Sequence, residues 1–502
     1  MQIAFFNPQG NFDNDDSYWT EHPDFGGQLV YVKELATALH RQGHEAVIFT
    51  RRMDDPEWPE FREPEEVYQG SGVRIIRVDF GGNRFLNKEE LWPYLNDYVT
   101  AIIKWYESTG ILPDIVTTHY GDGGIAGVLF EQRTGVPFTF TAHSLGAQKM
   151  DKLLKDPEDY DSLDQKLRFT VRLAAERTAM GRALVRMVST VQEKEHQYLH
   201  PLYRDLFANE KKRPFAVIPP GVNQNLFSPD EAVVDEEVRN LFEMVISRDI
   251  DDLRRYLPIA IASSRLNPKK NVTGLVAAYA QNPQWQQHCN LMLAVRGLDD
   301  PQKDFGALKS EEQEQIQLIL SIMDRHQLIG KISFINLSSQ KALGAAYREV
   351  ARRRGIFCLT SLYEPFGLAT IEAMSCGVPV VVTVNGGGQE ILSSQGTEYG
   401  ILVDPEDPEA ISRGAMDLLT DSERWEDYRE KGLKRVLTTY TWDAAGKAYV
   451  EAIHQHLKKA EQDHGKKVAA VPEVPEYFWD PTANNLGKLS WIRQAVLDRL
   501  TS

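Results

Sequence analysis

Two glutamates stand eight positions apart in the stretch Ser361-Leu-Tyr-Glu-Pro-Phe-Gly-Leu-Ala-Thr-Ile-Glu-Ala-Met374. On one continuous helix, Glu364 and Glu372 would lie ~12 Å apart along the axis and about 80° apart around it. Pro365 and Gly367 instead predict a loop at Glu364 and a helix that starts between the two carboxylates. Free N–H groups at a helix start attract phosphate, and carboxylates accept hydrogen bonds from hydroxyls. The stretch therefore predicts a nucleotide-sugar site.

A basic pair lies on a second loop, Ser264-Arg-Leu-Asn-Pro-Lys-Lys-Asn271, directly after the apolar run 258–263. Ligands of open α/β folds bind beyond the carboxyl ends of the strands, where this loop is expected. Arg265 can bind a diphosphate bidentately, and Lys270 supplies a point charge. Alone, the loop fits a basic surface equally well. Together with the glutamate pair it indicates a diphosphate clamp.

Glycine-rich turns accompany these charges. The sequence Asn385-Gly-Gly-Gly-Gln-Glu390 follows an apolar run, and Gly26-Gly27-Gln28 precedes a predicted helix. Glycine allows a ligand to approach the backbone closely. Neither turn is the GxGxxG motif of dinucleotide binding, and the strand ending at Thr50 is followed by Arg51 and Arg52, not by an acidic residue. A nicotinamide cofactor is therefore disfavoured.

The order of elements predicts an α/β fold with two domains. Strands are predicted at 3–7, 46–50, 73–78, 115–118 and 138–141, with helices at 29–42 and 91–109 between them. The pattern restarts near residue 217, with a strand within 215–222 and later strands at 258–263, 290–295, 332–336, 356–360 and 378–383. Such alternation predicts parallel sheets covered by helices. We expect one domain from 1–216 plus 444–502, and another from 217–443.

Two segments outside this alternation carry their own predictions. The acidic stretch 230–257 is typical of a solvated helical surface. After Trp442 a helix of about fifteen residues is expected. The aromatic run Tyr477-Phe-Trp479 near the end of the chain needs burial, which packing against the first domain would supply.

Composition narrows the functional classes. The 502 residues are 42% hydrophobic and 25% charged, with a formal net charge of −16, which opposes binding to nucleic acid or anionic lipid. No apolar run approaches the ~20 residues of a membrane span, and the start lacks the features of a signal peptide. Cys289, Cys358 and Cys376 lack CxxC spacing, which predicts free buried thiols. We expect a cytoplasmic enzyme.

A metal site is not expected. Asp-x-Asp matches occur at 13–15, 159–161 and 249–251, but they lie in acidic, surface-like stretches without a histidine cluster.

The motifs carry a family resemblance that covers nearly the whole chain. The second half resembles retaining glycosyltransferases of the GT-B class, in which Arg, Lys and Glu-x7-Glu grip a nucleoside diphosphate sugar. The first half resembles sucrose-phosphate synthases. It carries Asn7-Pro-Gln-Gly-Asn, Phe25-Gly-Gly-Gln-Leu-Val-Tyr-Val-Lys-Glu34, Leu91-Trp-Pro-Tyr, Thr118-His-Tyr-Gly-Asp-Gly-Gly and His143-Ser-Leu-Gly-Ala-Gln-Lys149. The resemblance implies two Rossmann-like, doubly wound domains facing across a deep cleft, with a C-terminal helix crossing back to the N-terminal domain.

The resemblance also implies roles for single residues. Arg265 and Lys270 would bind the diphosphate, Glu364 the transferred sugar and Glu372 the ribose, while His143 would contact the donor sugar near the reacting carbon. Of these, the catalytic set would be His143, Arg265, Lys270 and Glu364. The other donor-site positions would be Gly26, Gly27, Leu337, Phe366, Gly367, Leu368 and Ala369. The acceptor would be held by Gly27, Gln28, Lys88, Tyr120, Ser144, Lys149 and Arg172.

The implied reaction transfers glucose from UDP-glucose to fructose 6-phosphate, giving sucrose 6-phosphate and UDP with retention at glucose. No cofactor would be required, and a divalent cation would be at most stimulatory. The resemblance leads us to expect a monomer or weak oligomer, with a separate sucrose-phosphate phosphatase as a candidate partner.

Two departures from the family pattern leave the donor open. Gly388 stands where the family sequence Gly-Gly-Pro-x-Glu has proline, which would loosen a loop at the donor sugar, and Ala142 precedes His143 where glycine is common. The nearest alternative is a related transferase that uses GDP-mannose, ADP-glucose or another phosphorylated acceptor. A non-catalytic nucleotide-sugar sensor is a second alternative. A hydrolase is a third, and it would leave Lys88, Lys149 and Arg172 without a role.

Overall fold

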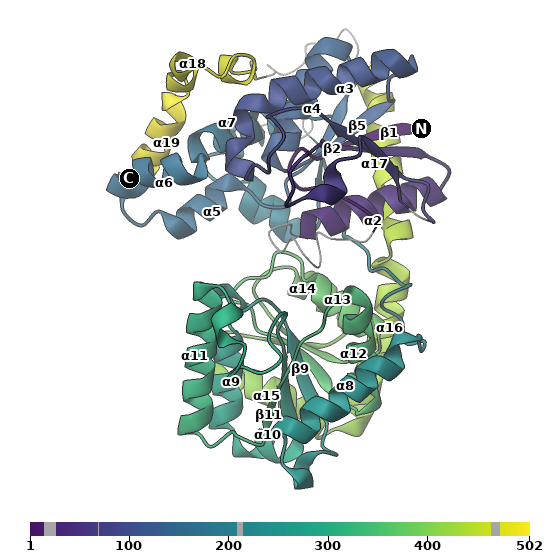
Figure 1. Cartoon of the computed structure of the whole chain (residues 1–502), viewed down its shortest axis with the longest axis vertical. Helices are drawn as coiled ribbons and strands as arrows, with labels where there is room; N and C mark the ends of the chain where they lie inside the picture. The colour runs from purple at the N-terminus through teal and green to yellow at the C-terminus, as the bar shows by residue number, and fades with distance from the viewer. Residues whose placement is uncertain (15–26, 69, 208–213, 463–471, 502) are drawn as a thin grey trace. The chain divides into compact units, whose positions relative to one another are not determined.

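The computed structural model describes residues 1–14, 27–68, 70–207, 214–462 and 472–501 (Figure 1). The chain forms two compact units, Met1–Pro219 with Ala445–Ser502, and Pro220–Ala444. The sequence placed these boundaries three residues and one residue earlier, after residues 216 and 443.

The first unit is built on an eight-stranded sheet in the order β3-β4-β2-β1-β5-β6-β7-β8, parallel except where the edge strand β3 pairs antiparallel with β4. Its central strands are buried on both faces, as in sheets covered by helices. The strands are β1 (Gln2–Phe6), β2 (Glu45–Arg51), β3 (Glu65–Val67), β4 (Arg74–Val78), β5 (Ile115–His119), β6 (Phe138–Thr141), β7 (Val185–Val188) and β8 (Phe215–Val217).

The helices of the first unit come from both parts of the chain that form it. They are α2 (Gly27–Arg41), α3 (Leu95–Thr109), α4 (Tyr120–Thr134), α5 (Gly146–Leu153), α6 (Tyr160–Leu167) and α7 (Phe169–Arg182), with α18 (Ala483–Gly487) and α19 (Ser490–Thr501) near the C-terminus. Short 3₁₀ turns lie at Lys88–Glu90, Trp92–Tyr94 and Glu476–Phe478. α3 and α4 each end at a glycine with positive φ, Gly110 and Gly135, where a residue with a side chain would be strained.

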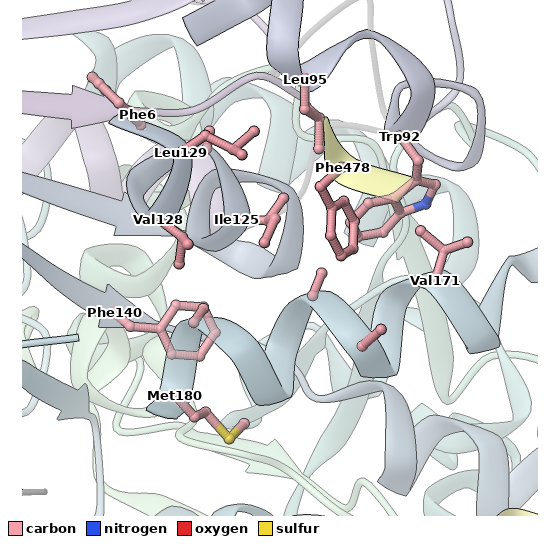
Figure 2. Packing of buried hydrophobic residues seen from close by; sticks show 14 of the residues in the cluster. Phe6, Trp92, Leu95, Ile125, Val128, Leu129, Phe140, Val171, Met180 and Phe478 are labelled. Carbon is pink, nitrogen blue, oxygen red and sulfur yellow. The ribbon is translucent and has the colours of Figure 1, made fainter. Parts of the chain in front are cut away.

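The C-terminal aromatic run packs into the core of this unit, as the sequence predicted. Tyr477 and Phe478 are buried there, and Trp479 packs against the same cluster. Figure 2 shows Phe478 beside Trp92 and close to Leu95. The C-terminal segment thus completes a core that the first 219 residues leave open.

The second unit contains a six-stranded parallel sheet in the order β11-β10-β9-β12-β13-β16. Its strands are β9 (Ile259–Ser263), β10 (Asn290–Ala294), β11 (Ile332–Ile335), β12 (Ile356–Leu359), β13 (Val380–Thr383) and β16 (Ile401–Val403). A two-stranded hairpin joins β14 (Ser393–Ser394) to β15 (Thr397–Glu398).

Helices of the second unit cover both faces of its sheet and form two hydrophobic clusters. They are α8 (Val234–Asp249), α9 (Val272–Gln281), α10 (Pro283–His288), α11 (Ser310–Arg325), α12 (Gln340–Arg352), α13 (Leu368–Ser375), α14 (Gly388–Leu392), α15 (Pro408–Leu419) and α16 (Ser422–Thr439). The long helix α17 (Trp442–Gln462) starts in this unit and continues into the first, which returns the chain to the N-terminal unit.

One sequence interpretation needs correction. The segment from Phe215 does not open the second sheet: β8 pairs with β7 at the edge of the first sheet, and the second sheet begins at β9. The acidic stretch forms a surface helix, α8, as predicted, with one face that buries Val238 and Phe242. Its Asp235 is also buried and forms an ion pair with Arg348 of α12. The prediction of free buried thiols is confirmed, because the three cysteines are free and buried.

Candidate active site

Glu364 and Glu372 lie on either side of the start of α13, as their spacing predicted. Gly367 caps the helix with φ +103°, a conformation that favours glycine, and the helix then runs from Leu368. The N–H of Thr370 donates to the Gly367 carbonyl at 2.9 Å. The N–H groups of Leu368 and Ala369, at the first two positions of the helix, have no preceding turn to donate to, so they form an anion-binding end. One carboxylate precedes this end and the other follows it by four residues.

Lys270 pairs with Glu364 across the two loops. Its Nζ donates to the Glu364 carboxylate oxygen Oε2 at 2.7 Å, and the Ser361 hydroxyl donates to the same oxygen at 3.2 Å. Within the described residues no group donates to the other oxygen, Oε1. Because an ammonium has three donors, Lys270 can hold Glu364 and a phosphate oxygen at once. The pair therefore leaves one carboxylate oxygen and two ammonium protons for a ligand.

The triple-glycine loop packs directly on the backbone of Glu364. The Glu364 N–H donates to the Asn385 carbonyl and the Gly387 N–H donates to the Glu364 carbonyl, both at 2.9 Å. A Cβ at Gly386 would lie 1.9 Å from the Glu364 carbonyl oxygen, and one at Gly388 would lie 2.6 Å from the Thr383 carbonyl oxygen. This backbone thus has no room for a Cβ at position 388, where the family pattern has proline.

Glu372 lies in a different environment. Its side chain is largely enclosed by protein atoms, and no described residue donates a hydrogen bond to it. Burial raises the pKa of Glu372 to about 7. A carboxylate at that pKa is poised to exchange hydrogen bonds with hydroxyls, and a bound ribose would supply them.

Arg265 follows β9 and is exposed, and the structure adds a second arginine beside it that the sequence interpretation missed. Ala294 at the end of β10 is in register with Ser263 at the end of β9, so Arg296 and Arg265 each lie two residues beyond paired positions. Burial and the neighbouring charge of Arg265 lower the pKa of Arg296. The signal was present in the sequence, since Arg296 stands directly after a predicted strand.

The remaining donor-side positions occupy the same edge of the second sheet. Leu337 lies two residues beyond β11, and Phe366 is buried with its ring against Tyr440. Leu368 and Ala369 open α13. The predicted donor-side residues of the second unit therefore lie at one edge of its sheet.

In the first unit, Gln28 lies in the first turn of α2 and is fixed by polar contacts to the end of β1. Its Nε2 donates to Asn7 Oδ1 at 2.6 Å, and its Oε1 accepts from Gln9 Nε2 at 2.9 Å. Gly27 begins the helix and is exposed, with open space around its Cα. Gly26 lies outside the described residues.

Arg172 organises the predicted acceptor side. Its guanidinium lies over the Tyr120 ring, 4.4 Å from the centroid, and Nη2 donates to Ser144 Oγ and its carbonyl at 3.1 and 3.0 Å. The guanidinium Nε donates to Glu176, one turn further along α7, at 2.8 Å. Glu176 is fully buried and also accepts from the N–H of Gly146 at the start of α5. The sequence interpretation missed Glu176, which holds Arg172 and the start of α5 together.

Lys88 and Lys149 complete the predicted cationic set. Lys88 begins a 3₁₀ turn, and Lys149 lies half-buried on α5, the helix whose start Glu176 holds. Near Lys88 and Arg172 lies Asp122, fully buried, with one carboxylate oxygen that has no partner among the described residues. Burial raises the pKa of Asp122 to about 7, against the effect of the Gly123 N–H, so this carboxyl is only about half ionised at neutral pH.

His143 stands between β6 and α5 in a left-handed backbone conformation, φ +57°. Such a conformation costs a non-glycine residue about 1–3 kcal/mol and concentrates at functional positions. Its Nε2 lies 2.9 Å from Nδ1 of His119, and the Tyr31 ring meets it edge-on with centroids 5.0 Å apart. Burial lowers the pKa of His143 to about 3, so the ring is neutral.

The described residues offer neither a metal site nor a membrane-spanning helix. No group of three or more His, Cys, Asp or Glu side chains could hold a metal ion there. No helix in the same part of the chain is both long and apolar enough to cross a membrane.

Both units of the chain match known protein families and solved structures. Residues 26–209 match the family described as glycosyl transferase 4-like domain, and residues 248–435 match glycosyl transferases group 1. The structure of sucrose-phosphate synthase from Thermosynechococcus elongatus superposes with a TM-score of 0.67 at 26% identity, covering 91% of this chain and 99% of that one. The catalytic domain of starch synthase IV from Arabidopsis thaliana shares the fold, with a TM-score of 0.63 at 13% identity.

The fold and the matched families define a glycosyltransferase of the GT-B class, built from two Rossmann-like units. A probable sucrose-phosphate synthase of Thermosipho melanesiensis is 43% identical over 91% of this chain and 97% of that protein. The chain belongs to the sucrose-phosphate synthase family and is a hexosyltransferase. Plant relatives are longer: the spinach enzyme is 29% identical, and the chain spans 45% of its length.

Proposed function

We propose that the chain transfers glucose from UDP-glucose to the anomeric hydroxyl of fructose 6-phosphate, forming sucrose 6-phosphate and UDP with retention at glucose. The observation that carries the proposal is the 43% identity to the Thermosipho relative across almost the whole of both chains. The residue geometry on the donor and acceptor sides supports it independently.

On the donor side, the bond between glucose C1 and the β-phosphate oxygen breaks, and negative charge develops on UDP. Arg265, Lys270 and the N–H groups at the start of α13 are placed to stabilise that charge. The Glu364 oxygen Oε1 accepts from a glucose hydroxyl, while Glu372 takes the ribose hydroxyls. Arg296, in register beside Arg265, adds a second guanidinium for the diphosphate.

On the acceptor side, the phosphate of fructose 6-phosphate is dianionic and needs a cationic site in a protein of net charge −16. Lys88, Lys149 and Arg172 supply the charges. Arg172 is preoriented by Glu176 and by the Tyr120 ring. Ser144, which Arg172 holds, and Gln28, which Asn7 and Gln9 hold, contribute hydrogen bonds to the sugar hydroxyls.

The proton of the attacking hydroxyl passes to the leaving β-phosphate oxygen, which places attack and departure on one face of the glucose ring. His143, which is neutral, acts on the donor sugar by hydrogen bonding and not by titration. The positive charges and the helix start carry out the neutralisation that a divalent cation would otherwise provide. The product retains a phosphate ester, so free sucrose requires a phosphatase acting afterwards.

A donor-by-acceptor matrix tests the proposal. UDP-glucose, ADP-glucose and GDP-mannose are each offered with fructose 6-phosphate, fructose and glucose 6-phosphate, and products are identified by mass spectrometry and anomeric NMR. We expect sucrose 6-phosphate from UDP-glucose and fructose 6-phosphate to dominate. A different dominant glycoside, or free glucose as the only product, would contradict the proposal.

Lys149→Ala tests the acceptor assignment in the same assay. We expect KM for fructose 6-phosphate to rise at least about tenfold, since a charge-assisted contact to phosphate contributes about 1.5–3 kcal/mol. KM for UDP-glucose should change less than about twofold. Unphosphorylated fructose is the control acceptor, because loss of a phosphate contact leaves its turnover unchanged. Equal effects on both substrates would remove Lys149 from the phosphate site.

A further inference from the structure

His119 lies directly behind His143 and has no role in the proposed function. It is the last residue of β5 and is fully buried. Its ring stacks on Phe5 with centroids 5.7 Å apart and planes within 4°, and it meets the His143 ring edge to edge with centroids 5.1 Å apart. Stacking on Phe5 does not require nitrogen atoms, so the hydrogen bonds must explain why an imidazole occupies this position.

Both ring nitrogens of His119 have partners. Nδ1 lies 2.9 Å from His143 Nε2, and Nε2 lies 3.3 Å from the Thr117 hydroxyl. The Thr117 hydroxyl in turn bonds to the hydroxyl of Tyr449, which also lies 2.8 Å from the Thr139 hydroxyl. A continuous relay of hydrogen bonds thus runs from α17, through the ends of β5 and β6, to His143.

The number of protons in this relay is fixed. Burial lowers the pKa of both histidines, and the neighbouring His143 adds to the effect at His119, so each ring is neutral with one N–H. One ring donates across the 2.9 Å contact and the other accepts, in either direction. In both arrangements each His119 nitrogen and His143 Nε2 already takes part in a hydrogen bond. The one ring nitrogen that remains is His143 Nδ1, which has no partner within the described residues.

We propose that His119 is the positioning residue of the transfer reaction: with Thr117 and Tyr449 behind it, His119 holds the His143 ring so that only Nδ1 is presented to the donor sugar. The inference rests on the proposed function for the meaning of that contact. The hydroxyl relay allows Nδ1 to donate or to accept, because all its hydrogen bonds can reverse together without a change in net charge. His143 thereby adapts to a sugar hydroxyl of either polarity.

Three contacts fix His143 from different directions. Its backbone is held in the left-handed region, Tyr31 packs edge-on against the ring, and His119 sets the rotation of the ring through Nε2. Removing the last contact leaves the ring in place but free to rotate. The expected consequence is slower chemistry with nearly unchanged substrate binding, since misplacement of a contacting group by about 1 Å can cost about 100-fold in rate.

The kinetic test uses four substitutions in the full-length chain. His119→Phe keeps the stacking and removes both nitrogens, and it should lower kcat by about 10- to 100-fold with both KM values within about threefold. His119→Gln restores a polar partner and should recover part of kcat. Tyr449→Phe, which cuts the relay further back, should lower kcat by a smaller factor. Tyr279→Phe is the control: it removes a buried hydroxyl in the second unit, bonded to the Cys289 carbonyl, and should leave kcat unchanged.

Imidazole ¹⁵N NMR of the substrate-free protein tests the hydrogen bond independently of turnover. The wild-type spectrum should show His143 neutral, with Nε2 hydrogen-bonded, and His119→Phe should shift the His143 Nε2 resonance. Tyr449→Phe should shift the His119 Nε2 resonance through the relay. If the histidines respond as described but sucrose 6-phosphate is not made, the proposed function fails and the His119–His143 coupling stands.

Other outcomes overturn the inference. An unchanged kcat in His119→Phe, or KM rising in proportion to the loss of kcat, would show that His119 does not position a reacting group. If His119→Phe does not fold, Tyr449→Phe decides, and a kcat equal to that of Tyr279→Phe refutes the relay.

Discussion

At the scale of single residues, the two glutamates of the donor site differ in what surrounds their carboxylates. Glu364 is paired with Lys270 at 2.7 Å, whereas Glu372 is enclosed without a donor among the described residues. Ionising an enclosed carboxylate without a partner is costly, and a pKa of about 7 corresponds to about 3 kcal/mol in the folded protein. In the proposed function, the ribose hydroxyls donate to Glu372 and offset this cost.

Glu372→Gln should therefore stabilise the free enzyme in a pH-dependent way. Between the ordinary glutamate pKa of 4.5 and the folded value of about 7, the folded protein binds more protons than the unfolded chain, so wild-type stability falls as pH rises. Glu372→Gln has no carboxyl group at this position, so its stability does not fall in this way as pH rises. Its free energy of unfolding should match that of wild type near pH 5 and exceed it by up to about 3 kcal/mol at pH 8, measured by urea denaturation of the second unit.

Glu364→Gln is the matched control for that measurement. It also removes one negative charge near the start of α13 but breaks the ion pair with Lys270, so its stability at pH 8 should not rise. Both variants should bind UDP-glucose more weakly. A Glu372→Gln variant with no gain in stability at pH 8 would contradict the enclosure of Glu372.

Sequence spacing predicted the residues of the donor clamp because each lies on a short loop next to its own strand or helix. Lys270 and Glu364 are 94 positions apart, yet both follow predicted strands and so had to meet at one sheet edge. Glu176 and His119 could not be found this way. Both are buried, and their roles depend on which way a side chain points from an element whose surroundings the sequence does not give.

At the scale of elements, the donor site is assembled by the close packing of two loops. The segment between β12 and α13 and the segment between β13 and α14 exchange two backbone hydrogen bonds at Glu364. Side chains would hold these loops apart, so glycine at 386 and 387 is a packing requirement and not only a source of flexibility. The position of the Glu364 carboxylate follows from this contact.

Gly386→Ala should displace Glu364 and weaken donor binding. Its Cβ would lie 1.9 Å from the Glu364 carbonyl oxygen, so one loop must move. We expect KM for UDP-glucose to rise at least about tenfold, with KM for fructose 6-phosphate little changed, because a shifted Glu364 loses a hydrogen bond to a charged group worth about 1.5–3 kcal/mol. Initial rates with one substrate varied at a time measure both constants.

Gly396→Ala controls for backbone strain alone. Gly396 also has a positive φ, +79°, but has nothing within 4 Å of its Cβ position. It should cost about 1–2 kcal/mol of stability without changing KM for the donor. Equal kinetic effects in the two variants would mean that strain, and not the contact with Glu364, explains the result.

At the scale of the whole molecule, alternating strand and helix patterns were sufficient to predict two parallel sheets, because a buried strand is recognisable from a few consecutive apolar residues. The point at which the first sheet ends and the second begins was harder to predict. β8 has the short apolar pattern of any strand, and only its pairing with β7 assigns it to the first sheet. The burial of Tyr477 and Phe478 was predictable, since an aromatic run exposed to water would be costly.

Each unit has its own hydrophobic core, which makes their stabilities separable. The core of the first unit includes Phe478 from the end of the chain, and one core of the second includes Phe357 on β12. Phe478→Ala should destabilise the first unit by about 3–5 kcal/mol, the usual cost of truncating a buried phenylalanine. The second unit should be unaffected, because no side chain of its cores is lost.

Hydrogen exchange measured by mass spectrometry reports the two units separately. Phe478→Ala should accelerate exchange in β1, β5 and α4 and leave β9 and β12 as in wild type. Phe357→Ala should produce the reverse pattern, which makes each variant the control for the other. If Phe478→Ala accelerates exchange in both units equally, they unfold as one cooperative body. If Phe478→Ala accelerates exchange in neither unit, the C-terminal segment contributes no stability to the first unit.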